Sequence, residues 1–545
     1  MTTDRGTGSS NPKGDSRPEW ASRWSFPPVA ASVLDATVEP VDGITAYPTR
    51  YVPSRLLVST LRDVDEAIAV LTKIADTLGW VLSRDEGFVT TPIAESEAAG
   101  AARRRRLPWA SGQLGLARLI LTASSVAQQA PDSWVLLQRA RREWGIGALQ
   151  GIGLDHVLSI SSPFGMTPFG MTPFGMTPFG MTPFGMTPFG MTGAVNPIAS
   201  YGYPGSGGLQ PVAFVGEAPR RTLDKEYRGR RPVIGTLDTG CGAHPWLDAI
   251  VRTRVDIDGV PIGLVDPSTD PEIWGDQFGP LDGALDQVAG HGTFIAGVLR
   301  QAAPDADIVA WRVAASDGTA HESDVVNALT GIAELVRRHA NGEPEGLPLD
   351  VLSLSMGYYH ETPTDDRLLD QTLQELLAVM GRCGTIVVCS AGNDATARPM
   401  FPAAFGPWVD GSGPCVQDPD ATSIVSVGAL NPNRSTVALF SNTGPWVRVY
   451  ERGVSVVSTI PVFEAGSMPA GRTVAYGLDR DSIDPDDYRG GFAVWSGTSF
   501  ASPLVAGRLA AQLDGTLLAA ANRSAAEVVD YSWKTIEKVT ALVRQ

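Results

Sequence analysis

Short apolar segments alternate with amphipathic segments between residues 231 and 428, and this alternation limits the fold more than any other feature of the chain. Buried-type strands are predicted at 231–238, 307–313, 350–355, 384–393 and 422–428. Helices are predicted between them, at 291–299, 323–338 and 366–380. Strands that alternate with helices predict an α/β fold, in which helices cover both faces of a parallel sheet.

Polar side chains follow three of these strands at the point where each strand ends. They are Asp238, Ser355 and Asn393. Ligands of open α/β sheets bind beyond the carboxyl ends of the strands. We therefore expect these three residues to lie on one rim of the sheet.

The segment Trp495–Pro503 places Ser499 among small residues, directly before an Ala-rich run with helical spacing. A serine at a helix N-terminus lies where free N–H groups and the helix dipole favour a developing negative charge. A serine hydroxyl is a weak nucleophile until a base accepts its proton. The chain must therefore supply a base if Ser499 is to react.

Three residues supply what Ser499 lacks. Among the six histidines, His291 alone stands in a Gly-His-Gly-Thr context, at a predicted helix start. Asp238 ends a strand in Asp-Thr-Gly and is placed to orient an imidazole, and Asn393 in Ser-Ala-Gly-Asn offers an amide donor beside a tight turn. Nucleophile, base, orienting carboxylate and oxyanion donor are thus all present, and the triad follows the order Asp, His, Ser.

That order and these contexts resemble the subtilisin-like serine proteases, or subtilases, over roughly residues 230 to 515. The motifs that carry the resemblance are Ile234-Gly235-Thr236-Leu237-Asp238-Thr239-Gly240, Gly290-His291-Gly292-Thr293, Leu354-Ser355-Met356-Gly357, Ser390-Ala391-Gly392-Asn393, Phe440-Ser441-Asn442-Thr443-Gly444-Pro445-Trp446 and Ser496-Gly497-Thr498-Ser499-Phe500-Ala501-Ser502-Pro503. The resemblance implies a serine endopeptidase of subtilisin-like fold whose substrates are proteins or peptides.

The resemblance also implies a role for each site residue. Ser499 attacks the peptide carbonyl, His291 transfers the proton, Asp238 holds the imidazole, and Asn393 stabilises the oxyanion together with the Ser499 N–H. Ser355, Met356 and Gly357 match the segment whose backbone pairs with the substrate as an added strand. Tyr358 departs from the family, which usually has glycine there, so we expect a reshaped substrate pocket.

The chemistry implied for this site requires no cofactor and no metal ion. A structural calcium ion is an open alternative in the Asp-rich stretch 461–490, and an ordinary acidic surface loop is the other interpretation. The aspartates that would bind calcium are Asp481, Asp484, Asp486 and Asp487. Cys241, close to Asp238, is expected to be a buried inert thiol, with sensitivity to oxidation or heavy metals as the alternative.

Composition limits the partners and the compartment. A net charge of −16 argues against nucleic acid, because phosphate binding requires a basic surface. Four cysteines are typical of free thiols in a reducing compartment, although one disulfide stays an alternative. Residues 1–28 lack the pattern of a secretory signal, and no apolar run is long enough to cross a bilayer. The sequence therefore predicts a cytoplasmic protein without membrane contact.

The chain divides into five predicted parts: a disordered N-terminus at 1–48, a small α+β domain at 49–157, a linker at 158–207, the catalytic domain at 208–522 and an amphipathic C-terminal helix at 523–545. In the α+β domain, strands are predicted at 55–60, 80–83 and 119–122, and helices at 63–78 and 132–144. Many subtilases carry an inhibitory propeptide of this size, so this domain is either propeptide-like or a separate partner-binding module. Its basic run Arg103–Arg106 predicts a solvated loop, with a nick site or a contact to an acidic partner as alternatives.

The linker contains Pro-Phe-Gly-Met-Thr six times without error, from Pro163 to Thr192. Proline and glycine in every unit exclude a helix interior or a strand ladder and favour an extended tether. Three roles stay open: a spacer, a docking array for a partner protein, or a segment that occupies the protein's own cleft. The leading hypothesis for the function of the whole protein is a regulated intracellular endopeptidase, either broad in substrate range or specific to one cleavage in an assembly. The alternative is a protease-derived scaffold that binds through the repeats with little turnover.

Overall fold

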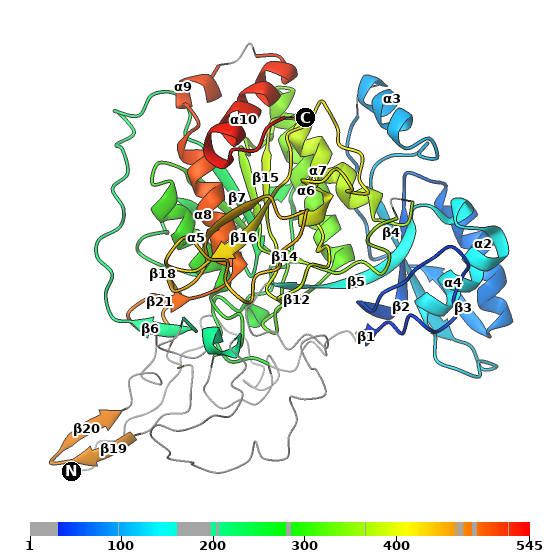
Figure 1. The fold of residues 1–545 in the computed structure, drawn as a ribbon, viewed down its shortest axis with the longest axis horizontal. Helices are drawn as coiled ribbons and strands as arrows, with labels where there is room; N and C mark the ends of the chain where they lie inside the picture. The colour runs from blue at the N-terminus through cyan, green and yellow to red at the C-terminus, as the bar shows by residue number, and fades with distance from the viewer. Residues whose placement is uncertain are drawn as a thin grey trace.

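A seven-stranded sheet in which every pairing is parallel forms the centre of the molecule (Figure 1). The computed structural model describes residues 31–95, 97–160, 198–202, 207–278, 285–365, 367–463, 466, 472–481, 488–520 and 523–544. The strand order is β17-β16-β15-β13-β7-β11-β8. The strands are β7 (Val233–Asp238), β8 (Val251–Arg252), β11 (Asp307–Arg312), β13 (Val351–Leu354), β15 (Ile386–Ser390), β16 (Val425–Leu430) and β17 (Val449–Arg452).

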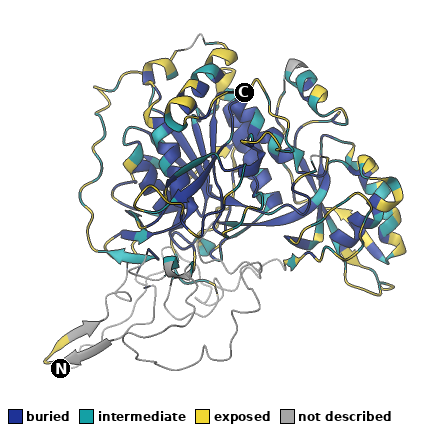
Figure 2. Cartoon of the chain, viewed as in Figure 1, coloured by how far each residue is buried: buried dark blue, intermediate teal, exposed yellow. Residues whose placement is uncertain are grey.

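Helices cover both faces of this sheet (Figure 1). On one face, α5 (His291–Ala302) and α8 (Thr498–Ala511) share a buried apolar cluster with Ile234 of β7. On the other face, α6 (Glu322–Ala340) and α7 (Gln371–Arg382) share a second cluster with Leu237. Figure 2 shows the strands between them as buried. The predicted α/β fold with a parallel sheet is confirmed.

Smaller elements complete the C-terminal region (residues 207–544). One antiparallel sheet joins β18 (Val456–Thr459), β21 (Phe492–Trp495) and β6 (Gln210–Val212), and two hairpins join β9 (Asp256–Ile257) to β10 (Val260–Pro261) and β19 (Arg472–Ala475) to β20 (Leu478–Asp481). The chain continues through α9 (Gly515–Leu518) into α10 (Ala525–Thr540). Ser524 and Glu527 form a capping box at the start of α10.

The N-terminal region (residues 31–160) has its own antiparallel strands in the order β5-β2-β4-β3 (Figure 1). Its elements are β1 (Ser32–Val33), β2 (Arg50–Ser59), α2 (Val64–Thr77), β3 (Trp80–Arg84), α3 (Glu97–Arg106), β4 (Leu116–Ala123), α4 (Ser133–Trp144) and β5 (Ile152–Ile160). Helices α2 and α4 bury their apolar sides against these strands. The segment predicted to be disordered, 1–48, overlaps the described residues only at 31–48, where β1 pairs with β2.

Strand β5 extends the N-terminal sheet into the C-terminal region. Along its second half it pairs antiparallel with β12 (Thr319–His321) and with β14 (Met356–Gly357). Its last residue, Ile160, also donates its N–H to the carbonyl of Gly318 at 2.9 Å. One continuous sheet therefore contains strands from both regions, and β5 runs past the predicted domain limit at residue 157.

The basic run Arg103–Arg106 is helical, so the prediction of a solvated loop is wrong. The guanidinium of Arg103 is 2% exposed and binds Glu95. Arg106 donates to Glu375 of α7 and lies 3.0 Å from Asp418. Arg104 and Arg105 are exposed, whereas carboxylates bind Arg103 and Arg106, so the run is a helix with one packed side rather than a solvated loop.

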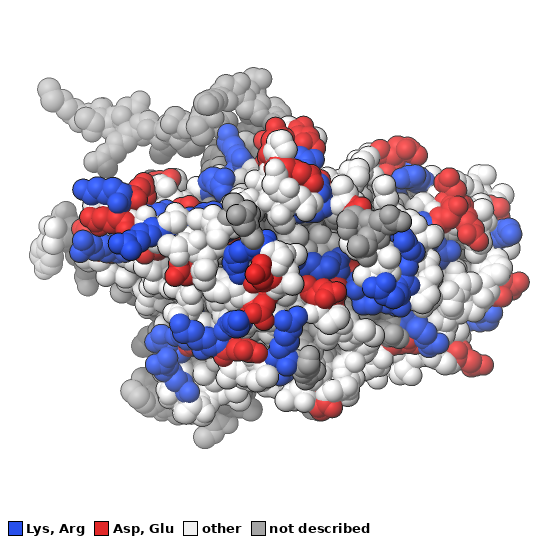
Figure 3. All heavy atoms as spheres, turned by 90° about the horizontal axis from the view of Figure 1, so that it is seen from above, with Lys and Arg blue, Asp and Glu red and all other residues white. Residues whose placement is uncertain are grey.

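Two further predictions concern segments outside the described residues. The six repeats from Pro163 to Thr192 are outside them, as are Asp484, Asp486 and Asp487 of the proposed calcium stretch. In the described part of the chain, none of the helices combines the length and the apolar character needed to span a membrane. Acidic and basic side chains are intermixed on the face seen in Figure 3.

Candidate active site

The three predicted rim residues lie at the carboxyl ends of adjacent parallel strands. Asp238 is the last residue of β7, Ser355 follows β13, and Asn393 lies just beyond β15. Strand β13 pairs with both β7 and β15, so these strand ends are neighbours. The structure therefore brings Asp238, Ser355 and Asn393 to one edge, as the order of strands and helices predicts.

Asp238 and His291 are in direct contact and fully buried. The Nδ1 atom of His291 lies 2.8 Å from Oδ1 of Asp238, and the same oxygen accepts the N–H of Thr239 at 2.8 Å. A carboxylate at Nδ1 assigns the ring proton to that atom and turns Nε2 into the basic nitrogen. Among the described residues, Nε2 of His291 has no hydrogen-bond partner.

Gly290 sets the position of the imidazole at the start of α5. Its φ is +77°, in the left-handed region that favours glycine. A Cβ at this residue would lie 2.6 Å from Cγ1 of Ile460. A glycine is therefore required directly before His291, as the Gly-His-Gly-Thr motif suggests.

Ser499 is the second residue of α8 and is fully buried. Its Oγ donates to the carbonyl of Ser355 at 3.5 Å, so the hydroxyl is not hydrogen-bonded to His291. The next residue, Phe500, packs its ring 5.2 Å from the His291 ring, which places the start of α8 beside the imidazole. Catalytic hydrogen bonds of this kind are often long or misaligned until substrate binds.

Pro503 has no backbone N–H, and this changes the hydrogen bonding at the start of α8. In a regular helix the N–H of residue 503 would donate to the carbonyl of Ser499, four residues earlier. That carbonyl instead accepts the hydroxyl of Ser355 at 3.1 Å. The proline thus leaves a helix carbonyl available to join the start of α8 to the end of β13.

The side chain of Asn393 is oriented by the first residue of α8. Its Oδ1 accepts both the N–H and the hydroxyl of Thr498, each at 2.9 Å. Because the amide oxygen is the acceptor there, the Nδ2 group is the part of Asn393 that can donate. This is the orientation that an oxyanion donor needs.

The predicted substrate-binding segment is occupied by the protein's own chain. Met356 pairs with Ile160 of β5, and Gly357 pairs with Ser159. On its other side, β5 pairs with β12, where Ala320 lies opposite Leu158. Strand β5 therefore lies between β12 and β14 as a third strand. No catalytic motif marks β5, and the only sequence signal for it is an apolar, partly alternating run.

Tyr358 faces the N-terminal region. Its ring stacks on His156 of β5 at 4.7 Å between ring centres, and its backbone pairs with Phe401. His156 is buried between two carboxylates, with Nδ1 2.5 Å from Glu322 and Nε2 2.8 Å from Glu361. Burial by itself lowers the pKa of His156, but the two carboxylates outweigh it and raise the pKa to about 10.

One group of metal-ligand type occurs among the described residues, formed by His156, His360 and Glu361. Both ring nitrogens of His156 are already hydrogen-bonded to carboxylates, Nδ1 to Glu322 and Nε2 to Glu361. We therefore assign this group to a buried ion-pair cluster. All four cysteines are free, as expected, and burial raises the pKa of the Cys241 thiol.

Comparison with known proteins agrees with this geometry. The sequence model of the subtilase family matches residues 229–536. The chain is 26% identical over 301 residues to an intracellular serine protease of Paenibacillus polymyxa, covering 52% of this chain and 67% of that protein. It is 27% identical over 308 residues to a thermophilic serine proteinase of Bacillus sp. (strain AK1), covering 56% and 57% of the two chains.

A third relative is the serine protease AprX of Bacillus subtilis (strain 168), 25% identical over 290 residues, with 51% of this chain and 56% of that protein covered. The match thus spans about half to two thirds of these curated relatives. The family model covers more than half of the chain and includes Asp238, His291, Asn393 and Ser499. The chain therefore belongs to the subtilase family.

Proposed function

We propose that this protein is a serine endopeptidase that hydrolyses peptide bonds through Asp238, His291 and Ser499. The observation that carries the proposal is the 2.8 Å contact between Asp238 and Nδ1 of His291, buried beside the start of α8. Membership of the subtilase family and the names of its relatives support the same activity.

In the proposed reaction, Ser499 Oγ attacks the peptide carbonyl while Nε2 of His291 accepts its proton. Asp238 stabilises the imidazolium through Nδ1, and the imidazolium then donates its proton to the leaving amine. The Nδ2 group of Asn393 and the backbone N–H of Ser499 stabilise the oxyanion. The substrate backbone pairs with Ser355–Gly357 as an added strand. The residues of this chain supply every acid, base and hydrogen-bond donor of the proposed reaction.

We further propose that the N-terminal region inhibits the enzyme until β5 leaves. The support is that β5 lies on β14, where a substrate strand would pair, and that Leu158 and Ile160 are buried in one apolar cluster with Met356. A substrate and β5 cannot pair with the same edge of β14. Displacement or cleavage of the segment after β5 would then open the site.

The remaining proposals concern compartment, calcium and the repeats. Four free thiols and a relative named as an intracellular serine protease support action inside the cell. Structural calcium in the stretch 461–490 is tested by comparing the melting temperature with and without a chelator. The alternative function, a scaffold that binds a partner through the repeats, predicts that Ser499→Ala changes nothing that the protein does.

Hydrolysis of an unfolded protein substrate tests both the activity and the inhibition. The Leu158→Asp variant places a charge in the buried contact of β5 and is expected to hydrolyse faster than the wild type. The double variant Leu158→Asp/Ser499→Ala is its matched control and is expected to be inactive. Hydrolysis by the double variant contradicts the role of Ser499. Equal rates for the wild type and Leu158→Asp contradict inhibition by β5 alone.

A further inference from the structure

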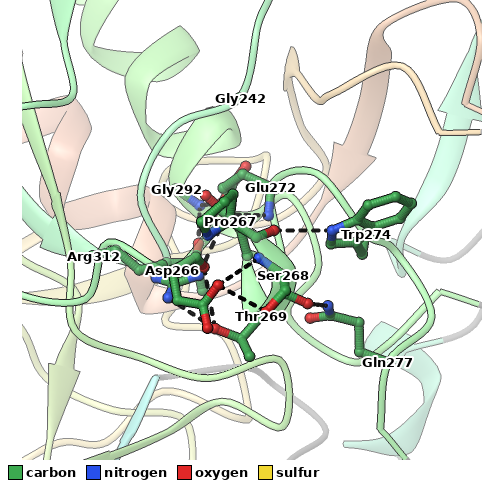
Figure 4. A network of polar contacts seen from close by, with 12 residues as sticks. Gly242, Asp266, Pro267, Ser268, Thr269, Glu272, Trp274, Gln277, Gly292 and Arg312 are labelled. Atoms are coloured by element: carbon green, nitrogen blue, oxygen red, sulfur yellow. Dashed lines mark hydrogen bonds and ion pairs between the residues drawn. The ribbon is translucent and has the colours of Figure 1, made fainter. Parts of the chain in front are cut away.

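A carboxylate that belongs to none of the sequence motifs lies beside the Asp238–His291 pair. Glu272 is 3% exposed and stands in the loop that follows the short helix η3 (Pro267–Thr269). Figure 4 shows its side chain close to Gly292, at the start of α5. The reaction proposed above does not use this carboxylate.

On one side, Glu272 holds the residue that follows Asp238. The hydroxyl of Thr239 donates to Oε1 of Glu272, and it also lies 3.2 Å from Oδ1 of Asp238. The N–H of Thr239 donates to the same Asp238 oxygen at 2.8 Å. A shift of Glu272 would therefore reach the Asp238 carboxylate through a single residue.

On its other side, Glu272 holds the two residues that follow His291. Its Oε1 accepts the N–H of Gly292 at 2.9 Å. Its Oε2 accepts the N–H of Thr293 at 3.3 Å and the hydroxyl of Thr293 at 2.5 Å. The first N–H groups of a helix have no partner within the helix, and Gly290 at the N-cap offers no side chain. Glu272 therefore caps the helix that His291 begins.

Hydrogen bonds of the loop that contains Glu272 fix the position of this residue (Figure 4). The N–H of Glu272 donates to Oδ1 of Asp270 at 2.9 Å. Trp274 donates its ring N–H to the carbonyl of Pro267 at 2.9 Å, and Arg312 of β11 donates to the hydroxyl of Thr269 at 3.0 Å. The loop is thus closed on itself and tied to the strand next to β7.

We propose that Glu272 is a positioning residue that fixes Asp238 against His291, because one carboxylate binds the residue after each of them. This inference rests on the proposed peptidase function. Four donors point at two oxygens, and only an ionised carboxylate accepts from all four. A glutamine would turn an N–H₂ group toward at least one of these donors. Loss of the carboxylate leaves the buried N–H of Thr293 without its acceptor, whereas the N–H of Gly292 keeps the hydroxyl oxygen of Thr239 at 2.8 Å.

The charge of Glu272 also acts on the site. Burial raises the pKa of Glu272 to about 7, while the hydroxyls of Thr239 and Thr293 work against that rise. Several ionisable groups surround it: Asp238 at the end of β7, Cys241 beyond it, Asp270 in its own loop, His291 of α5 and Arg312 of β11. A carboxyl group with this pKa changes its charge near neutral pH, and it accepts from all four donors only while it is ionised.

Labelling of the full chain by a fluorophosphonate probe tests the inference, because the labelling rate reports how well Ser499 and His291 are activated. The variant is Glu272→Gln. We expect the maximal labelling rate to fall about tenfold or more, since small misplacements of catalytic groups have effects of this size or larger. The half-saturating probe concentration should change less than twofold. The pH dependence of the labelling rate should also change, because the variant lacks a carboxyl group that titrates near pH 7.

Two further variants separate positioning from general damage. Thr239→Val removes the hydroxyl between Glu272 and Asp238, so Thr239→Val combined with Glu272→Gln should lose far less than the product of the single losses. Asp266→Ala is the matched control, because the carboxylate of Asp266 accepts the N–H and the hydroxyl of Ser268 in the same loop. Its labelling rate should stay within threefold of the wild type.

The outcomes are distinguishable. A wild-type rate and pH profile in Glu272→Gln would overturn the inference. So would an equal loss in Asp266→Ala accompanied by an equal fall in melting temperature, since the loop would then act only through stability. If the wild type and Leu158→Asp both resist the probe, the proposed peptidase function fails instead.

Discussion

In the candidate site, His291 and Asn393 each have one of their two polar atoms hydrogen-bonded to a neighbouring residue, which fixes the orientation of the side chain. Asp238 occupies Nδ1 of His291 and Thr498 occupies Oδ1 of Asn393. In the proposed mechanism the other end of each side chain acts on the substrate, Nε2 as base and Nδ2 as donor. The proposed chemistry thus depends on these two hydrogen bonds as well as on the reacting groups.

The amide of Asn393 is tested by Asn393→Asp. The aspartate keeps an oxygen for the N–H of Thr498 but has no N–H₂ group for an oxyanion, so the start of α8 should stay in place. We expect the rate of peptide hydrolysis, measured in the Leu158→Asp background, to fall about 100- to 1,000-fold. An unchanged rate would show that Asn393 does not stabilise the transition state. A large fall in melting temperature would show that its role is in folding.

At the scale of elements, β5 is the strand that links the two regions. Its buried His156 stands between Glu322, the first residue of α6, and Glu361. The carboxylates raise the pKa of His156 to about 10 in the docked state, against roughly 6.5 for an exposed histidine. When β5 docks at a pH between these two pKa values, His156 therefore takes up a proton.

This proton makes the docking of β5 depend on pH. A group whose pKa rises on docking contributes its full stabilisation below the undocked pKa and loses it as pH rises through the docked value. Inhibition should therefore weaken from about pH 7 to pH 10. Hydrolysis by the wild type should rise more steeply over this range than hydrolysis by His156→Gln, which has no such proton. Parallel profiles for the two proteins would contradict the prediction.

Elements with a strong local pattern could be predicted from the sequence, and those formed by distant contacts could not. The strands β7, β13 and β15 are short apolar runs between helices, and Asp238, Ser355 and Asn393 follow from their ends. Strand β5 and helix α3 are stabilised by partners far along the chain, such as β14 for β5 and Glu375 for Arg106. Glu272 lies in no motif, and only its contacts in the folded chain identify it.

At the scale of the whole molecule, the N-terminal region contacts the C-terminal region at more than β5. Arg106 of α3 shares Glu375 and Asp418 with Arg382 of α7. Trp109 donates its ring N–H to Gln371 at the start of α7 at 2.9 Å. The two regions are thus joined along α7 as well as at the candidate active site, and loss of either contact should loosen both.

Arg106→Met tests this second contact. The methionine keeps the apolar bulk but removes one of the two guanidinium groups, so that Arg382 alone pairs with Glu375 and Asp418. We expect docking to weaken by about 1–3 kcal/mol, below the cost of breaking a fully buried pair because Arg106 keeps some exposure. The melting temperature should fall and hydrolysis should rise. Arg104→Met, in the same helix, is the control and should change neither quantity.

The most direct test of the central claim is the position of a serine-reactive label. The full chain is treated with a fluorophosphonate probe, digested and analysed by mass spectrometry, with Ser499→Ala treated in parallel. The account predicts one adduct, on Ser499, which is absent from Ser499→Ala and forms faster in Leu158→Asp. A stable adduct on another serine, or no adduct in either the wild type or Leu158→Asp, would contradict the claim that this subtilase cleaves peptide bonds through Ser499.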